Sequence, residues 1–108
     1  MKWIAETLDQ RVDEELSALP SALRARLLRI VELIEHVGLE QVREPHIKHL
    51  EDKLWEMRAK APEGIARAIY VTATGKRLVI LHVFVKKAQK TPKQAIETAR
   101  QRAKEILQ

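Results

Sequence analysis

The 108-residue sequence contains no cysteine, which excludes disulfide bonds and thiolate metal sites and is compatible with a reducing compartment. It has no apolar run long enough to span a membrane, and residues 1–7 lack the apolar core of a signal peptide. Internal repeats and low-complexity segments are also absent. We therefore expect one domain over residues 1–108 that is soluble and cytoplasmic.

Basic residues exceed acidic ones by 20 to 15, which gives a formal net charge of +5. This excess favours polyanionic partners but does not fix the fold. The most informative segment is an apolar strand over residues 80–85, followed by Lys86, Lys87 and Lys90 and then by a helix start at Pro92. Cations at a strand end, beside the free N–H groups of a helix start, suit a phosphate chain. The sequence therefore predicts a nucleic-acid partner.

The spacing of apolar residues predicts an α+β fold with a helical hairpin packed on an antiparallel sheet. Ser/Thr-x-x-Gln spacing suggests capping boxes that begin at Thr7 and Thr91. The expected elements are an N-terminal strand over 2–5, a helix after Thr7, a second helix from Pro20 to Gly38, a loop over 39–53, strands over 54–60, 65–73 and 78–86, and a C-terminal helix over 92–107.

Alternation along the three central strands divides the sheet into an apolar face and a mixed face. The apolar face, which we expect the hairpin to cover, carries Trp55, Met57, Ala59, Ala66, Ala68, Tyr70, Val79, Leu81, Val83 and Val85. The mixed face carries Glu56, Arg58, Lys60, Arg67, His82, Phe84 and Lys86 among Leu54, Ile65, Ile69 and Ile80. Four-residue loops would close the two hairpins by pairing Lys60 with Ile65 and Ala73 with Leu78.

This register places Arg58 opposite Arg67, and Arg67 opposite Phe84. Opposed like charges destabilise a sheet by about 0.2–1 kcal/mol, so the pair requires an anion. Glu56 can supply it in a network that only ties the strands together. A bound phosphate can supply it instead, with Arg67 as a planar fork and Phe84 as a stacking surface for a base.

Three segments carry a family resemblance: "LWEMR" at 54–58, "ARAIY" at 66–70 and "ILHVFVKKAQKTPKQAIETARQRAKEI" at 80–106. With the order of the elements, they resemble the RelE/ParE toxin superfamily, and within it the phage-derived HigB-like toxins of type II toxin–antitoxin modules. The resemblance covers nearly the whole chain. It implies a RelE-like fold.

The resemblance also implies an activity, that of a ribosome-dependent mRNA endonuclease which inhibits translation. Such a toxin needs no cofactor or metal, and we expect no metal site at His36, His46 or His49. The ribose 2′-hydroxyl attacks the adjacent phosphate while basic side chains move protons and stabilise charge. The implied partners are the ribosome, mRNA and a cognate helix-turn-helix antitoxin of the HigA type, with no role for a membrane.

The resemblance assigns catalytic roles to Arg67, which lies three residues before Tyr70 in an Arg-x-x-Tyr strand, and to Arg58. His82 has two interpretations on this face. It can carry protons near neutral pH, or it can be a packed, hydrogen-bonded residue of a half-buried strand.

Basic residues beyond the last strand complete the predicted site. The resemblance implies a basic group at Lys86 or Lys87, and alternation favours Lys86 as the catalytic one. We expect Phe84, Lys87, Lys90 and Lys93 to bind RNA. The alternative for the lysines is a solvated helix face.

Two other functions fit the same scaffold. One is ParE-like inhibition of DNA gyrase, and the other is non-catalytic binding of nucleic acid. Converging cations at Arg58, Arg67 and Lys86 favour RNA cleavage, because a gyrase-binding surface does not need them. We expect the antitoxin to cover the mixed face or the last helix, since Ile65, Ile69 and Phe84 would otherwise be exposed beside these cations.

Overall fold

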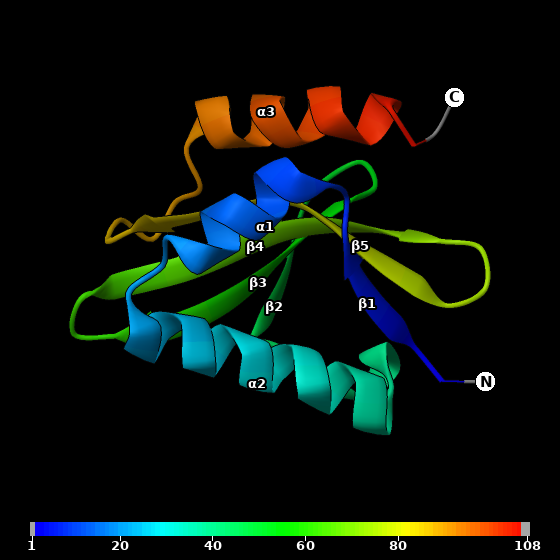
Figure 1. Cartoon of the computed structure of the whole chain (residues 1–108), viewed down its shortest axis with the longest axis horizontal. Helices are drawn as coiled ribbons and strands as arrows, with labels where there is room; N and C mark the ends of the chain where they lie inside the picture. The colour runs from blue at the N-terminus through cyan, green and yellow to red at the C-terminus, as the bar shows by residue number, and fades with distance from the viewer. Residues whose placement is uncertain (1, 107–108) are drawn as a thin grey trace.

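The computed structural model of the protein describes residues 2–106 and confirms the α+β class. Helix α2 covers one face of a mixed sheet and α3 covers the other, while α1 lies alongside β5 (Figure 1). This is the RelE-like arrangement that the resemblance implies. In chain order the elements are β1 (Ile4–Thr7), α1 (Gln10–Ser17), α2 (Ser21–Val37), the 3-10 helix η1 (Leu39–Gln41), β2 (Ile47–Glu51), β3 (Leu54–Ala61), β4 (Gly64–Ala73), β5 (Arg77–Lys86) and α3 (Lys93–Lys104).

The sheet has the strand order β1-β5-β4-β3-β2. Strands β3, β4 and β5 form the predicted antiparallel meander, whereas β1 pairs with β5 in parallel, so the sheet is mixed. The prediction of a loop over 39–53 is wrong, because this segment contains η1 and β2. In β2 both Lys48 and His49 are exposed, so this edge strand forms through pairing with β3 and shows little apolar alternation.

The start of α1 differs from the prediction. Asp9, not Thr7, is the N-cap residue, and its carboxylate accepts a hydrogen bond from the Arg11 backbone N–H at 3.0 Å. Thr7 belongs to β1, and its hydroxyl donates to Asp13 at 2.6 Å. The end of α2 agrees with the prediction, since Gly38 follows it with φ 98°, a conformation that glycine adopts without strain. Helix α3 is shorter than the predicted 92–107, whose last residue lies outside the described chain.

A β-bulge in β5 corrects the predicted register at one end of the sheet. Ala73 pairs with Arg77, not with the predicted Leu78, but the bulge restores the predicted pairing of Arg67 with Phe84 further along the strand. The prediction from simple alternation is therefore right beyond the bulge and wrong before it.

The bulge also exchanges the faces of residues in the first half of β5. Val79 and Leu81 pack in the cluster beneath α3, and Ile80 packs in the cluster beneath α2. This is the reverse of the predicted assignment, because an extra residue in one strand shifts the alternation by one position.

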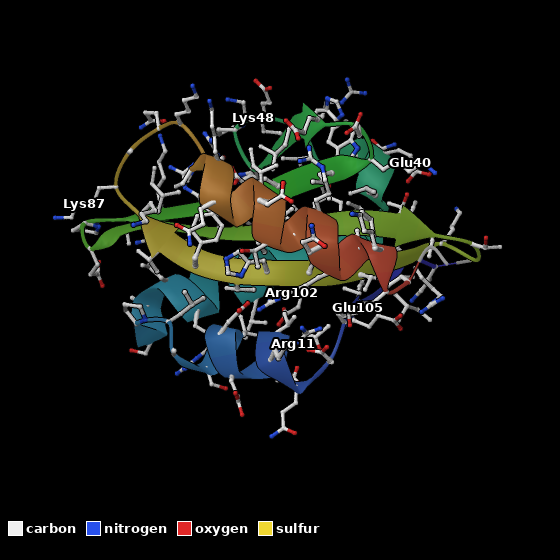
Figure 2. The ribbon with its side chains drawn as sticks, turned by 90° about the horizontal axis from the view of Figure 1, so that it is seen from above. Arg11, Glu40, Lys48, Lys87, Arg102 and Glu105 are labelled. Carbon is white, nitrogen blue, oxygen red and sulfur yellow. The ribbon has the colours of Figure 1, made fainter. Side chains whose placement is uncertain are left out.

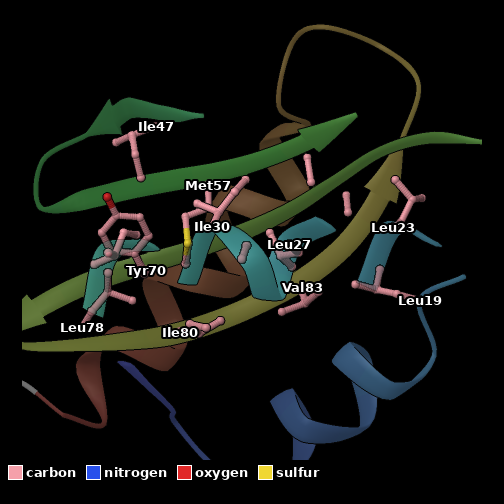
Figure 3. Close-up of a cluster of buried hydrophobic side chains, with 14 of the residues drawn as sticks. Leu19, Leu23, Leu27, Ile30, Ile47, Met57, Tyr70, Leu78, Ile80 and Val83 are labelled. Atoms are coloured by element: carbon pink, nitrogen blue, oxygen red, sulfur yellow. The ribbon is translucent and has the colours of Figure 1, made fainter. Parts of the chain in front are cut away.

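Two apolar clusters hold the layers together. Leu23, Leu27 and Ile30 of α2 pack with Met57 and Tyr70 of the sheet (Figure 3). On the opposite face, α3 contributes the small buried side chains of Ala95, Ala99 and Ala103. None of the helices in the described chain is long and apolar enough to cross a membrane.

Tyr70 provides a test of the larger cluster. Its side chain is 1% exposed, its hydroxyl has no hydrogen-bond partner within residues 2–106, and burial raises the pKa of the phenol above its ordinary value of 10.0. We predict that Tyr70→Phe preserves or increases stability at neutral pH, by up to about 1 kcal/mol, because it removes an unpaired polar group. Urea denaturation of both proteins measures this change.

The same denaturation experiment at alkaline pH tests how the Tyr70 phenol contributes to the free energy of unfolding. A raised folded-state pKa means that the folded protein holds the phenol proton more tightly, so this stability contribution is lost as the pH rises above about 10. The parent protein should lose more stability than Tyr70→Phe in this range. A variant that is less stable than the parent at both pH values would show that the buried hydroxyl stabilises the fold, contrary to expectation.

Candidate functional site

The sheet register brings the predicted site residues onto one face, beneath α3 and the segment that precedes it. Arg67 lies between Arg58 on β3 and Phe84 on β5, as predicted. The neighbouring cross-strand rows place the other candidates on the same face, in the sets Glu56–Ile69–His82 and Lys60–Ile65–Lys86. The structure therefore collects one carboxylate, several cations and the rings of Phe84 and His82 in a small area.

Glu56, Arg58 and Arg67 form what we call the arginine cluster. The Arg58 Nε donates to Glu56 Oε1, and Arg67 Nη1 lies 3.6 Å from the same oxygen. The side chains of Glu56 and Arg67 are fully buried, whereas that of Arg58 is 10% exposed. The cluster is covered by residues 87–92, the strap, which connects β5 to α3.

The strap is tied to the arginine cluster by two groups. The Gln89 carbonyl accepts hydrogen bonds from Arg58 Nη2 at 2.7 Å and from Arg67 Nη1 at 3.1 Å. The Thr91 hydroxyl donates to Glu56 Oε2 at 2.8 Å and accepts from Arg67 Nη1 at 3.3 Å. The predicted capping box at Thr91 is wrong, because its hydroxyl binds the cluster, and Pro92 occupies the N-cap position of α3.

The charges of the arginine cluster do not balance. Two guanidinium groups share one carboxylate, which leaves one excess positive charge. Within residues 2–106, the buried Nε and Nη2 of Arg67 have no hydrogen-bond partner. Desolvation lowers the pKa of Arg67, Glu56 opposes that change, and the nearby Arg58 charge lowers the pKa further. Excess charge and unused donors are the features that an oxyanion such as phosphate would satisfy.

His82 belongs to a second network at the edge of β5. Its Nδ1 lies 3.0 Å from Glu15 Oε1, and Arg102 Nη1 contacts Glu15 Oε2 at 2.9 Å. The same carboxylate accepts the Val83 backbone N–H at 2.9 Å, and so covers an edge that β1 leaves unpaired. The His82 ring stacks on Phe84, with 5.0 Å between ring centroids. These contacts hold the His82 ring in place beside the arginine cluster.

Glu15 and the contacts of Gln89 and Thr91 with the arginine cluster were missed by sequence reasoning. Glu15 is one of several acidic residues in α1, and only the tertiary structure brings it to β5 from the opposite end of the sequence. Arg102 lies on the side of α3 that faces α1 (Figure 2). Gln89 acts through its backbone carbonyl, which no side-chain pattern can reveal.

The predicted lysines lie on the surface around the strap. Lys86, Lys87, Lys90 and Lys93 are all exposed, and Lys87 points away from the molecule (Figure 2). They form a basic rim beside the buried arginines. Such a rim suits contacts with phosphates of a nucleic-acid backbone, and it equally suits a solvated surface.

Comparison with known proteins adds one finding. A family model described as "Phage derived protein Gp49-like (DUF891)" matches residues 14–104. The match extends from α1 to the end of α3 and includes the arginine cluster, the strap and Glu15. No curated protein matches the chain.

The arginine cluster generates a stability prediction. Glu56→Ala removes the carboxylate between two buried cations, and we expect it to lower the free energy of unfolding by about 3–5 kcal/mol. Adding Arg67→Met to this variant should recover part of the loss, because it removes one of the opposed charges. Urea denaturation tests both changes, with Glu63→Ala in the exposed β3–β4 turn as the control. A Glu56→Ala protein as stable as the control would show that the carboxylate does not hold the arginines.

Proposed function

The chain belongs to the Gp49-like family of phage-derived proteins, and on this basis we propose that it is the toxin of a type II toxin–antitoxin module. Within that class we propose a HigB-like mRNA endonuclease that acts on the ribosome and needs no metal. Its partner is a helix-turn-helix antitoxin of the HigA type. The family membership supports the class, and the arginine cluster supports the chemistry.

The observation that carries the proposal is the excess positive charge of the arginine cluster. In RNA cleavage of this kind, the 2′-oxygen bonds to phosphorus as the bond to the 5′-oxygen breaks. The 2′-hydroxyl loses its proton to water, the leaving 5′-oxygen gains one from water, and negative charge accumulates on the phosphate oxygens while both bonds are partly formed. Two planar guanidinium groups at neighbouring positions suit that charge, because each presents parallel N–H donors.

The cations have separate roles in this proposal. Arg58, the more accessible arginine, contacts the phosphate first. The buried Arg67 donates further hydrogen bonds to the phosphate through its unused Nε and Nη2. Lys86, exposed at the end of β5, supplies a further cation for the leaving group. Phe84 and the basic rim at Lys87, Lys90 and Lys93 hold the bases and backbone of the RNA.

Access to the arginine cluster requires movement of the strap. The Gln89 carbonyl occupies donors on Arg58 and Arg67 that a phosphate would need. We propose that phosphate oxygens replace this carbonyl when RNA binds, so that the strap has a closed and an open position. The replacement exchanges a neutral acceptor for an anionic one, which the excess charge of the cluster favours.

A second candidate is non-catalytic binding of nucleic acid. The observation that favours it is the burial of the cluster, since Gln89 and Thr91 already accept hydrogen bonds from Arg58 Nη2 and Arg67 Nη1. In that case the arginines would only tie β3, β4 and the strap together, and the exposed lysines would do the binding. Cleavage distinguishes the two candidates.

The test is substitution of the accessible arginine. We predict that Arg58→Gln abolishes growth inhibition when it is expressed in a bacterial host, because it removes charge stabilisation in the transition state. Lys104→Ala, which neutralises an exposed cation at the far end of α3, should remain as toxic as the parent. Arg67 is less suitable for the test, because it is fully buried and its loss also disturbs packing.

Cleavage assays with the same proteins complete the test. Lys and Arg side chains keep their protons at neutral pH, so the site is poor at activating a hydroxyl and depends on the ribosome to align the RNA. The parent protein should cut mRNA in the ribosomal A site, leave naked mRNA nearly intact, and produce a 2′,3′-cyclic phosphate end. Arg58→Gln should bind but not cut. Equal cleavage by parent and Arg58→Gln at equal stability would refute the proposed site.

A further inference from the structure

A groove lies between α2 and the end of β3, apart from the strap. Its volume is about 840 Å³. It is lined by Arg26, Arg29, Ile30, Glu32, Leu33 and His36 of α2, by Pro45 and His46 before β2, and by Arg58, Ala59 and Lys60 of β3. The groove therefore shares Arg58 with the arginine cluster and otherwise uses residues that the proposed function leaves without a role.

One wall of the groove is an open edge of the sheet. Strand β2 pairs with β3 only as far as Met57, and the Arg58 N–H then donates to the His46 carbonyl at 2.8 Å. Backbone groups alternate along a strand, so those of Lys60 point the same way as those of Arg58. The Lys60 carbonyl accepts a hydrogen bond from Arg26 Nη1 at 2.7 Å. By the same alternation, the Lys60 N–H faces the groove, where an extended chain could continue the line of β2.

The groove has an apolar floor and basic side chains along its sides. Leu33, which is 42% exposed, supplies most of the apolar surface, and the largely buried Ile30 and Ala59 lie beside it. Four arginine and lysine residues line the groove against one acidic residue, Glu32. The lining contains no phenylalanine, tyrosine or tryptophan on which a base could stack. This combination fits an acidic protein segment with apolar side chains better than it fits RNA.

One of the two surfaces on which we expected the antitoxin, the mixed sheet face, has its isoleucines covered within the chain; the last helix stays a prediction. Ile65 is 5% exposed, and Ile69 is fully buried in the cluster beneath α3. The expectation that Ile65 and Ile69 are exposed is therefore wrong, whereas Lys60 and Lys86 of the same face are exposed. The groove offers what that face does not, namely open apolar surface beside unburied cations.

We propose that an acidic, extended segment of the antitoxin binds in this groove, pairs with the β3 edge at Lys60 and places a carboxylate against Arg58. This inference rests on the proposed function. It also gives a physical route to inhibition, because a carboxylate on Arg58 neutralises the excess charge of the arginine cluster without opening the strap. The occupant is thus defined by its chemistry. It has a carboxylate that contacts Arg58, an apolar side chain that packs near Leu33, and an extended backbone.

The experiment uses the protein encoded by the adjacent reading frame as the probe. Leu33→Asp places a charge on the apolar floor, and Arg29→Glu reverses the charge of a basic side chain that lines the groove. The matched control is Leu28→Asp, which changes a comparable α2 leucine, 38% exposed, outside the groove. We expect both groove variants to stay toxic, to bind the probe at least about tenfold more weakly in calorimetry, and to escape its rescue of growth. The control should be rescued like the parent.

The outcomes separate the two proposals. Groove variants that remain toxic and are rescued with parental affinity would overturn the groove and leave the toxin assignment intact. A parent protein that does not inhibit growth would overturn the proposed function, and the inference with it. Hydrogen exchange on the complex provides an independent reading: protection at residues 58–60 and along α2 supports the groove, while protection confined to α3 refutes it.

Discussion

The rest of this structure depends on two arginines that face each other across β3 and β4. Arg58 and Arg67 are Cα partners in the register, and this arrangement is stable only if an anion lies between them. Glu56 provides one buried carboxylate for two cations. The strap supplies further acceptors through a carbonyl and a hydroxyl, and α3 begins directly after it.

This arrangement joins stability and function in the same residues. Covering the arginine cluster excludes water and strengthens each of its electrostatic interactions, but it leaves two donors of Arg67 unused. A phosphate that displaced the Gln89 carbonyl would satisfy the excess charge that the folded protein tolerates. The separate network of Glu15, His82 and Arg102 holds the far edge of β5 in place. Packing and charge thus fix the sheet, and in the proposed mechanism the strap is the part whose contacts an anion replaces.

Local sequence predicted much of the sheet and little of what surrounds the site. Alternation correctly placed Arg58, Arg67 and Phe84 in one row, because these positions follow regular pairing. It failed before the bulge in β5, where an extra residue reverses the faces. It also missed β2, because this short strand shows little apolar alternation and forms through its pairing with β3. The roles of Gln89 and Thr91 depend on contacts across the fold, so the spacing near Thr91 suggested a helix cap instead.

The most direct test of the proposed mechanism is a structure of the protein on a ribosome whose A-site codon carries 2′-O-methyl riboses, which prevent cleavage. The quantity to measure is the distance from the guanidinium nitrogens of Arg58 to the nearest phosphate oxygen. The mechanism predicts hydrogen-bond contact, with the Gln89 carbonyl displaced from both arginines. A complex in which the strap still covers the arginine cluster, and the RNA contacts only the surface lysines, would contradict it.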